Sequence, residues 1–264
     1  MTGTLVVCGI VAALSAAAWP GRGRWRLNRV LPALAVLVLG LICYAGYLGY
    51  YGGPIYTDVA PAGGGGKDRP AAAAVILSGD MGFHVGMGPK MAARLAADGV
   101  AVVGVNSLTV FRTRRTQQDA ASMIERAVRH AMAFGRADRV ILIGQSYGAD
   151  MLQSGAPLLP PSIRRHIALV ALVVPGETVS YRASPSDLLS LPGDEVDGVA
   201  TGRLLGWTPT LCIFGREETD SLCPHLSPAV VTRIGLPGGH SLDSDAAALY
   251  RVLRAAIDRS LSRA

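Results

Sequence analysis

The 264-residue sequence has little of what a metal site or a nucleic-acid interface needs. It contains only four cysteines, with no CxxC pair and no histidine or cysteine at zinc-ligand spacing around them. Its net charge of +6 is not gathered into a basic stripe interleaved with aromatic residues. We therefore expect no metal ion, no cofactor and no nucleic-acid partner.

Acidic residues are scarce at the N-terminal end, where Asp58 is the only one before residue 60. Half of the chain (50%) is hydrophobic, more than an ordinary soluble domain needs, and two apolar runs cover residues 5–19 and 30–51. The second run is long enough to cross about 30 Å of hydrocarbon. We predict that residues 1–52 form a membrane anchor of two apolar helices joined by a basic turn.

The basic turn, residues 21–29, is rich in arginine, and arginine-rich short loops stay in the cytoplasm. This rule places the remainder of the chain outside the cytoplasm. A cleaved signal peptide is the alternative, with the arginines as its n-region and residues 30–43 as its h-region. Both interpretations export the domain that follows.

Residues 53–70 include four consecutive glycines and are predicted to form a flexible linker. A phosphate loop is excluded because no strand precedes the glycines and no Gly-Lys-Ser/Thr follows them. Residues 71–264 then form the folded domain. Within it, residues 176–207 are rich in Ser, Pro, Gly and Asp and are interpreted as a cap or lid insertion, with a disordered surface loop as the alternative.

Short apolar runs alternate with segments of helical spacing along the domain. Six runs predict strands, at 73–77, 100–105, 140–143, 167–174, 210–214 and 230–234, and helices are predicted at 89–97, 116–134 and 243–261. Continuous apolar strands separated by helices indicate an α/β fold, with a doubly wound, mostly parallel sheet that is covered on both faces. Such folds place their chemistry at the carboxyl ends of the strands.

A Gly-x-Ser-x-Gly motif, residues 144–148, follows one predicted strand and precedes a helix. This is the context of the nucleophile elbow of α/β-hydrolases, so Ser146 is the candidate nucleophile. In that fold the base lies in the loop after the last strand, where His240 stands among glycines. The acid is expected after the preceding strand. Asp220 is favoured there for its shorter side chain, and Glu217 and Glu218 remain alternatives.

An oxyanion hole needs two backbone N–H groups near the nucleophile. Tyr147, directly after the serine, is the first expected donor. Asp80 or Met81, in the loop after the first strand of the domain, is the second.

Four segments together resemble the bacterial VirJ/AcvB family: 78–80, 144–150, 220–224 and 236–240, which read SGD, GQSYGAD, DSLCP and LPGGH. The resemblance extends over residues 71–261. The chain departs from the family pattern at Met81 and Phe83, where Gly and Trp are usual, and at Ser241 and Leu242, where His and Phe are usual.

The resemblance implies a periplasmic enzyme at the bacterial inner membrane that hydrolyses aminoacyl-phosphatidylglycerol, a membrane lipid. It also implies a disulfide between Cys212 and Cys223, which an oxidising compartment permits. A cationic headgroup would favour a nearby carboxylate, from Asp80 or Asp150, unless those side chains only stabilise the turn and the helix start. Gln145 joins Asp150 as a candidate substrate-binding residue.

Two other functions fit the same residues. One is an esterase, thioesterase or acyltransferase that acts on another acyl group with the same triad. The other is a binding factor on a hydrolase fold without catalysis, because VirJ-like proteins are associated with secretion machinery and virulence.

Overall fold

The computed structural model describes residues 24–62, 71–183 and 196–263, and the chain divides into two units, residues 1–47 and 48–264. The first unit contains helix α2, Arg24–Leu48, which runs on into the second unit by one residue. Its stretch Val30–Leu48 has a mean hydropathy of 2.2, and its length and composition suit either a membrane span or a signal sequence. The predicted first apolar run, residues 5–19, lies outside the described residues.

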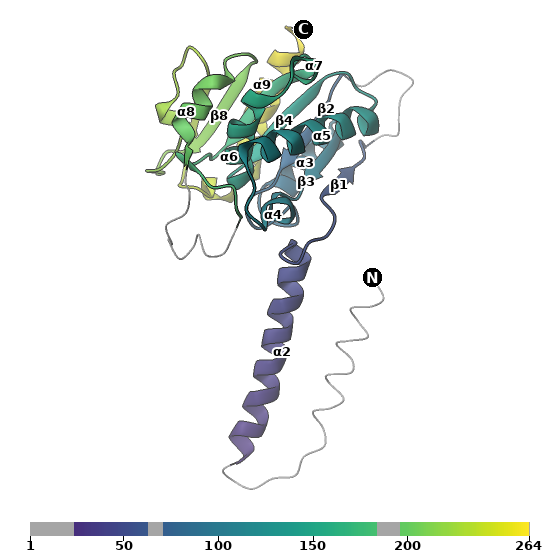
Figure 1. Ribbon diagram of the computed structural model, residues 1–264, viewed down its shortest axis with the longest axis vertical. Helices are drawn as coiled ribbons and strands as arrows, with labels where there is room; N and C mark the ends of the chain where they lie inside the picture. Colours follow the sequence, from purple (N-terminus) through teal and green to yellow (C-terminus); the bar gives the residue numbers. More distant parts are fainter. Residues whose placement is uncertain (1–23, 63–70, 184–195, 264) are drawn as a thin grey trace. The chain divides into compact units, whose positions relative to one another are not determined.

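The second unit is built on a seven-stranded sheet in the order β1-β3-β2-β4-β5-β8-β9 (Figure 1). The strands are β1 Tyr56–Val59, β2 Ala73–Leu77, β3 Ala101–Val105, β4 Val140–Gln145, β5 Ile167–Val173, β8 Thr210–Gly215 and β9 Thr232–Leu236. All neighbouring pairs are parallel except β1 with β3. The predicted doubly wound, mostly parallel sheet is confirmed.

Strand β1 corrects the predicted linker. Residues 56–59 do not form a tether but pair with β3 along the edge of the sheet. The pairing gives hydrogen-bond partners to an edge that would otherwise be open. The folded unit therefore begins well before residue 71, and the predicted linker residues 63–70 lie outside the described residues.

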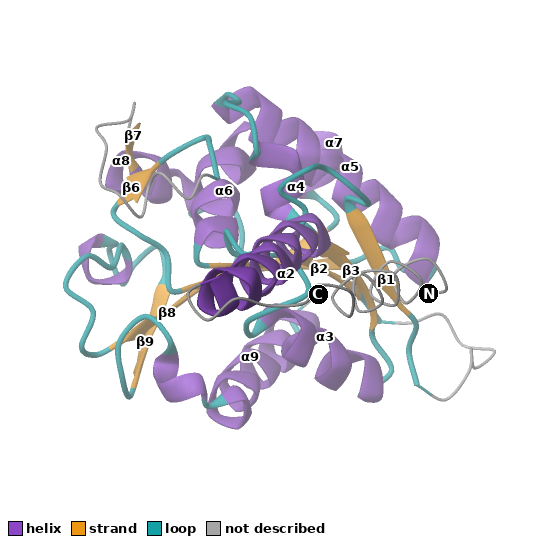
Figure 2. Cartoon of the chain, turned by 90° about the horizontal axis from the view of Figure 1, so that it is seen from below, coloured by secondary structure: helices purple, strands orange, loops and turns teal. Residues whose placement is uncertain are grey.

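Helices cover both faces of the sheet, with α3 and α9 on one side and α5 and α6 on the other (Figure 2). The helices of this unit are α3 Gly88–Ala97, α4 Ser107–Phe111, α5 Gln117–Gly135, α6 Tyr147–Gly155, α7 Pro161–Arg164, α8 Gly198–Gly202 and α9 Ala246–Leu261, and short 3₁₀ turns cover 156–158, 203–205, 223–225 and 242–244. Side chains of β2 alternate between the two cores: Val75 packs with α5, and Ile76 packs with α3.

The described parts of the predicted insertion, residues 176–183 and 196–207, contain regular secondary structure. A two-stranded ribbon joins β6, Thr178–Val179, to β7, Val196–Asp197, and α8 follows directly. Helix α8 packs on α6, where the Thr201 hydroxyl donates to Gln153 Oε1 at 3.1 Å. Residues 184–195, the centre of the predicted lid, lie outside the described residues.

Candidate active site

Ser146 stands at the turn between β4 and α6 with φ 50° and ψ −124°, a strained conformation for a residue other than glycine. The turn is so tight that only glycine fits two residues before Ser146 and two residues after it. A Cβ at residue 144 would lie 2.6 Å from Ala149 Cα, and a Cβ at residue 148 would lie 2.5 Å from the Ser78 carbonyl oxygen. This geometry matches a nucleophile elbow and lifts the Ser146 hydroxyl above the end of the sheet.

His240 approaches Ser146 from the loop between β9 and α9. Its Nε2 lies 2.8 Å from Ser146 Oγ, a hydrogen-bond distance at which the hydroxyl donates to a neutral imidazole. The two residues are 94 positions apart in the chain, so the fold itself brings the predicted nucleophile and base together.

The carboxylate next to His240 belongs to Glu218, whereas the sequence favoured Asp220. Glu218 Oε1 lies 2.7 Å from His240 Nδ1, and its side chain is only 4% exposed. Strand β8 ends at Gly215, and a turn follows. The Glu218 N–H closes this turn by donating to the Gly215 carbonyl at 3.1 Å. The Gly215 N–H in turn donates to Glu218 Oε2 at 2.7 Å, so both carboxylate oxygens have partners. Glu218 is therefore fixed against the imidazole.

Asp220 lies two residues farther along, on a segment that pairs with residues 175–177. Its carbonyl oxygen accepts from the Glu177 N–H at 3.0 Å, and Ser221 forms a β-bridge with Gly176. The side chain of Asp220 is close enough to Asp150 to raise the pKa of that carboxyl group. Asp220 thus belongs to the surroundings of α6, and Glu218 takes the place at the imidazole that the sequence predicted for Asp220.

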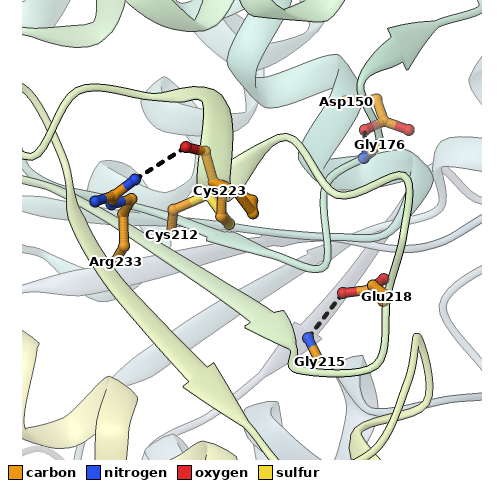
Figure 3. Close-up of a disulfide and its surroundings, with 8 residues drawn as sticks. Asp150, Gly176, Cys212, Gly215, Glu218, Cys223 and Arg233 are labelled. Carbon is orange, nitrogen blue, oxygen red and sulfur yellow. Dashed lines mark hydrogen bonds between the residues drawn. A yellow bond between two sulfur atoms is a disulfide. The ribbon is translucent and has the colours of Figure 1, made fainter.

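Asp150 stands one turn after Ser146 on α6, and its Oδ1 accepts from the Gly176 N–H at 2.9 Å (Figure 3). Burial raises the pKa of Asp150 well above its ordinary value, and the charges of Asp220 and Asp80 raise it further. The hydrogen bond from Gly176 opposes these effects. The site therefore favours a neutral carboxyl group at position 150.

The raised pKa of Asp150 predicts a pH-dependent gain in stability for Asp150→Asn. In wild type, the unfolded carboxyl ionises above about pH 3.9 while the folded one stays protonated, so stability falls until the pH passes the folded pKa. Asn keeps an oxygen for Gly176 but has no charge. We expect the variant to have a higher melting temperature than wild type at pH 8 and the same melting temperature near pH 4. Thermal unfolding at both pH values checks this, and a pH-independent difference would contradict it.

The turn after β2 lies directly against Ser146. A Cβ at residue 79 would be 3.7 Å from Ser146 Cβ, and the Gly82 N–H closes the turn on the Gly79 carbonyl at 3.2 Å. Asp80 and Met81 are the central residues of this turn, which we call the oxyanion turn (residues 79–82). Asp80 and Met81 line the same cavity as Ser146, and Tyr147 is the first residue of α6, so the oxyanion donors stay a prediction for these three residues.

A cavity of about 300 Å³ opens beside the Ser146 hydroxyl. It is lined by the oxyanion turn, by the start of α3 with Lys90, by Gln145 and by the His240 loop. Asp150 is not among its lining residues, and neither are the described parts of the 176–207 insertion. Gln145 thus lines the cavity beside the nucleophile, and its role in substrate binding stays a prediction. The lid stays a prediction for residues 184–195. The described residues include no group of three or more metal-ligating side chains.

Cys212 and Cys223 form a disulfide between β8 and the 3₁₀ turn at 223–225 (Figure 3). It joins two residues 11 positions apart in the chain, and Glu218 lies between them. A further bond holds the turn, because Arg233 Nη1 donates to the Pro224 carbonyl at 2.9 Å. The carboxylate next to His240 therefore stands in a covalently restrained loop.

Removing this disulfide is expected to lower the free energy of unfolding by about 2–4 kcal/mol, since the unfolded chain gains freedom. Urea denaturation of Cys212→Ala/Cys223→Ala checks the magnitude. Dithiothreitol should destabilise wild type by a similar amount and leave the double variant unchanged. Equal stability of wild type and variant would show that the crosslink adds nothing.

Solved structures of low sequence identity share this fold. Est1E from Butyrivibrio proteoclasticus matches with a TM-score of 0.53 and 14% identity, over 77% of this chain and 94% of that one. An alpha-beta serine hydrolase homologue from Coxiella burnetii matches with a TM-score of 0.52 and 15% identity, over 75% and 88%. A thioesterase domain from the curacin biosynthetic pathway matches with a TM-score of 0.50 and 15% identity, over 75% and 94%.

These likenesses establish the α/β-hydrolase fold. No curated protein matches the chain significantly. A family model, described as bacterial virulence protein (VirJ), matches residues 71–261, which is most of the chain and confirms the resemblance noted in the sequence. The chain therefore belongs to the VirJ family.

Proposed function

We propose that the protein is a serine ester hydrolase whose triad is Ser146, His240 and Glu218. The observation that carries the proposal is the pair of contacts at His240, with Nε2 2.8 Å from Ser146 Oγ and Nδ1 2.7 Å from Glu218 Oε1. In this arrangement the imidazole takes the serine proton, and the carboxylate stabilises the imidazolium that forms.

The reaction follows in two steps. Ser146 Oγ attacks the ester carbonyl carbon while its proton passes to His240 Nε2, and the N–H groups of Tyr147 and the oxyanion turn stabilise the negative oxygen. The alcohol leaves with the proton from His240, which leaves an ester on Ser146. Water, deprotonated by His240, then attacks this ester, and the acid is released with Ser146 restored.

We further propose that the substrate is a membrane lipid, because Leu48, the first residue of the second unit, lies against the oxyanion turn. Leu48 is the last residue of α2, and its carbonyl oxygen accepts from Asn106 Nδ2 at 2.9 Å. The same oxygen packs against Gly82, because a Cβ at residue 82 would lie only 2.4 Å from it. Gly82 also has a φ of +76°, which favours glycine. If α2 spans the bilayer, its last residue brings the cavity close to the membrane surface.

Aminoacyl-phosphatidylglycerol is the lipid that best fits this position, as the family resemblance implied. Asp80 and Lys90 both line the cavity, so it offers a carboxylate to the ammonium of the amino acid and an ammonium to the lipid phosphate. Hydrolysis of this ester returns phosphatidylglycerol and a free amino acid.

A periplasmic position of the domain accords with two features. The disulfide between Cys212 and Cys223 belongs to an oxidising compartment, and the arginines before residue 30 favour a cytoplasmic N-terminal side. We therefore propose an inner-membrane protein whose catalytic unit faces the periplasm.

The test is release of amino acid by the full chain reconstituted in vesicles. Vesicles containing lysyl- or alanyl-phosphatidylglycerol should release lysine or alanine, and vesicles with the Ser146→Ala variant should not. Release from p-nitrophenyl acetate but from neither lipid would keep the hydrolase and exclude this substrate. Absence of any hydrolysis would favour the binding factor, for which secretion-system proteins are the candidate partners.

A further inference from the structure

A second cavity, of about 450 Å³, lies beside the chain that leaves α2. Its lining begins with Tyr51, Gly52 and Gly53, three to five residues after the helix ends, and includes Ile55. Three arginines line the rest of it, namely Arg112, Arg115 and Arg126, together with Thr109, Val110 and Asp119. We call it the arginine cavity, and none of its lining residues belongs to the active-site cavity.

Positive charge predominates in the arginine cavity. Asp119 is the one acidic lining residue, and its Oδ2 already accepts from the Thr116 hydroxyl at 2.8 Å and from the Thr116 N–H at 2.9 Å. Within the described residues, no carboxylate lies within 4.0 Å of an arginine of this cavity. The guanidinium donors that remain are available to an anion with several acceptor oxygens, such as a phosphate group.

The backbone holds the cavity in place. Arg112 Nη1 donates to the Thr109 carbonyl at 2.8 Å, and the backbone N–H of Arg115 donates to the Tyr181 carbonyl at 2.9 Å. Gly52 lies over the Arg112 guanidinium, because a Cβ at residue 52 would be 3.6 Å from Arg112 Cζ. The segment after α2 and the arginines thus form one surface.

The rim of the arginine cavity is suited to a lipid interface. Tyr51 is 66% exposed and Ile55 is 40% exposed, so an aromatic ring and an aliphatic side chain stand beside the cations. This combination is typical of residues at the membrane surface. Tyr51 is three residues from Leu48, a separation that the chain cannot extend beyond about 10 Å. A membrane that holds α2 would therefore lie within reach of the cavity.

We propose that the arginine cavity binds the phosphodiester headgroup of an anionic phospholipid in the leaflet next to the catalytic unit. This proposal rests on the membrane placement of α2 in the proposed function, but not on catalysis. Segment 48–53 contacts the oxyanion turn through Leu48 and lines the arginine cavity from Tyr51 onward. A bound headgroup would hold this segment, and with it the active-site entrance, against the bilayer.

The test uses the full chain in nanodiscs of phosphatidylcholine, with or without 30 mol% phosphatidylglycerol (about one lipid in three). Amide hydrogen exchange is measured by mass spectrometry in peptides that cover residues 51–55 and 109–119. We expect exchange to slow about fivefold with phosphatidylglycerol, roughly the effect of one cation at a lipid surface. Arg115→Gln/Arg126→Gln should abolish the slowing, and Arg126→Gln alone should weaken it.

Arg251→Gln/Arg259→Gln removes the same charge from α9, on the other side of the sheet, and should keep the slowing (Figure 2). Equal exchange in both kinds of nanodisc would overturn the proposal, and so would loss of the effect in this control, because attraction would then be diffuse. If inorganic phosphate slows amide exchange in nanodiscs of pure phosphatidylcholine, the cavity is a site for free anions, and the lipid assignment is overturned. Each readout is independent of hydrolysis, so an inactive enzyme leaves the test intact.

Discussion

Glu218→Gln is expected to lower kcat for ester hydrolysis by about 10⁴-fold, with little change in folding. In wild type, Gly215 donates to Glu218 Oε2 and His240 Nδ1 faces Oε1. A glutamine would keep its oxygen on the Gly215 N–H and turn its NH₂ group toward His240. The imidazole would then carry its proton on Nε2 and could not accept one from Ser146.

Two neighbouring carboxylates provide matched comparisons. Glu217→Gln makes the same change at an exposed position and should leave kcat within about threefold of wild type. Asp220→Asn should also keep its activity, because the partner of His240 Nδ1 is Glu218. Loss of about 10⁴-fold in Asp220→Asn with a functional Glu218→Gln would reverse the assignment of the acid. Amino acid release from aminoacyl-phosphatidylglycerol vesicles measures all three.

Ser146→Ala is expected to lower kcat by about 10⁶-fold, because the covalent step has no other nucleophile. Residual hydrolysis would come only from binding and from the oxyanion donors. The alanine must adopt the same positive φ, so the thermal stability of the variant should stay close to that of wild type. Single-turnover hydrolysis and a melting curve on the same sample separate chemistry from folding.

Residues that act as one unit give non-additive losses. Adding Glu218→Gln to Ser146→Ala should therefore cause no further loss, although the single Glu218 variant loses about 10⁴-fold. A double variant that loses activity additively would show that Glu218 acts separately from Ser146. Substantial activity of Ser146→Ala would remove the nucleophile from the proposal altogether.

The arrangement of the sheet followed from local patterns in the sequence. Apolar runs such as 73–77 and 140–143 are fully buried in β2 and β4, as continuous runs in parallel strands should be. Strand β9 begins at Thr232 rather than 230, because the Val230 N–H closes a turn on Ser227 at 2.9 Å. Strand β1 was missed because four residues at an antiparallel edge carry a weak pattern beside glycine-rich segments.

The sequence alone did not identify the acid of the triad, because that choice depends on the geometry of the turn after β8. A choice between Glu218 and Asp220 by side-chain length ignores where the backbone places each residue. The turn that closes Glu218 on Gly215 brings position 218 back over the end of β8, and two further residues carry Asp220 to the segment beside Gly176. The signal in the sequence was the position of Glu218, three residues after Gly215, the glycine that ends the strand. By contrast, Ser146 and His240 are set directly at strand ends, where sequence patterns are most informative.

Labelling by a fluorophosphonate tests the central claim most directly, because this reagent reacts fast with a serine hydroxyl that a neighbouring base activates. With the full chain, mass spectrometry should find the adduct on Ser146, and His240→Ala should slow its formation by about 10²–10⁴-fold, the usual contribution of a general base. An adduct that forms on Ser146 equally fast without His240, or none on Ser146 in wild type, would contradict the account.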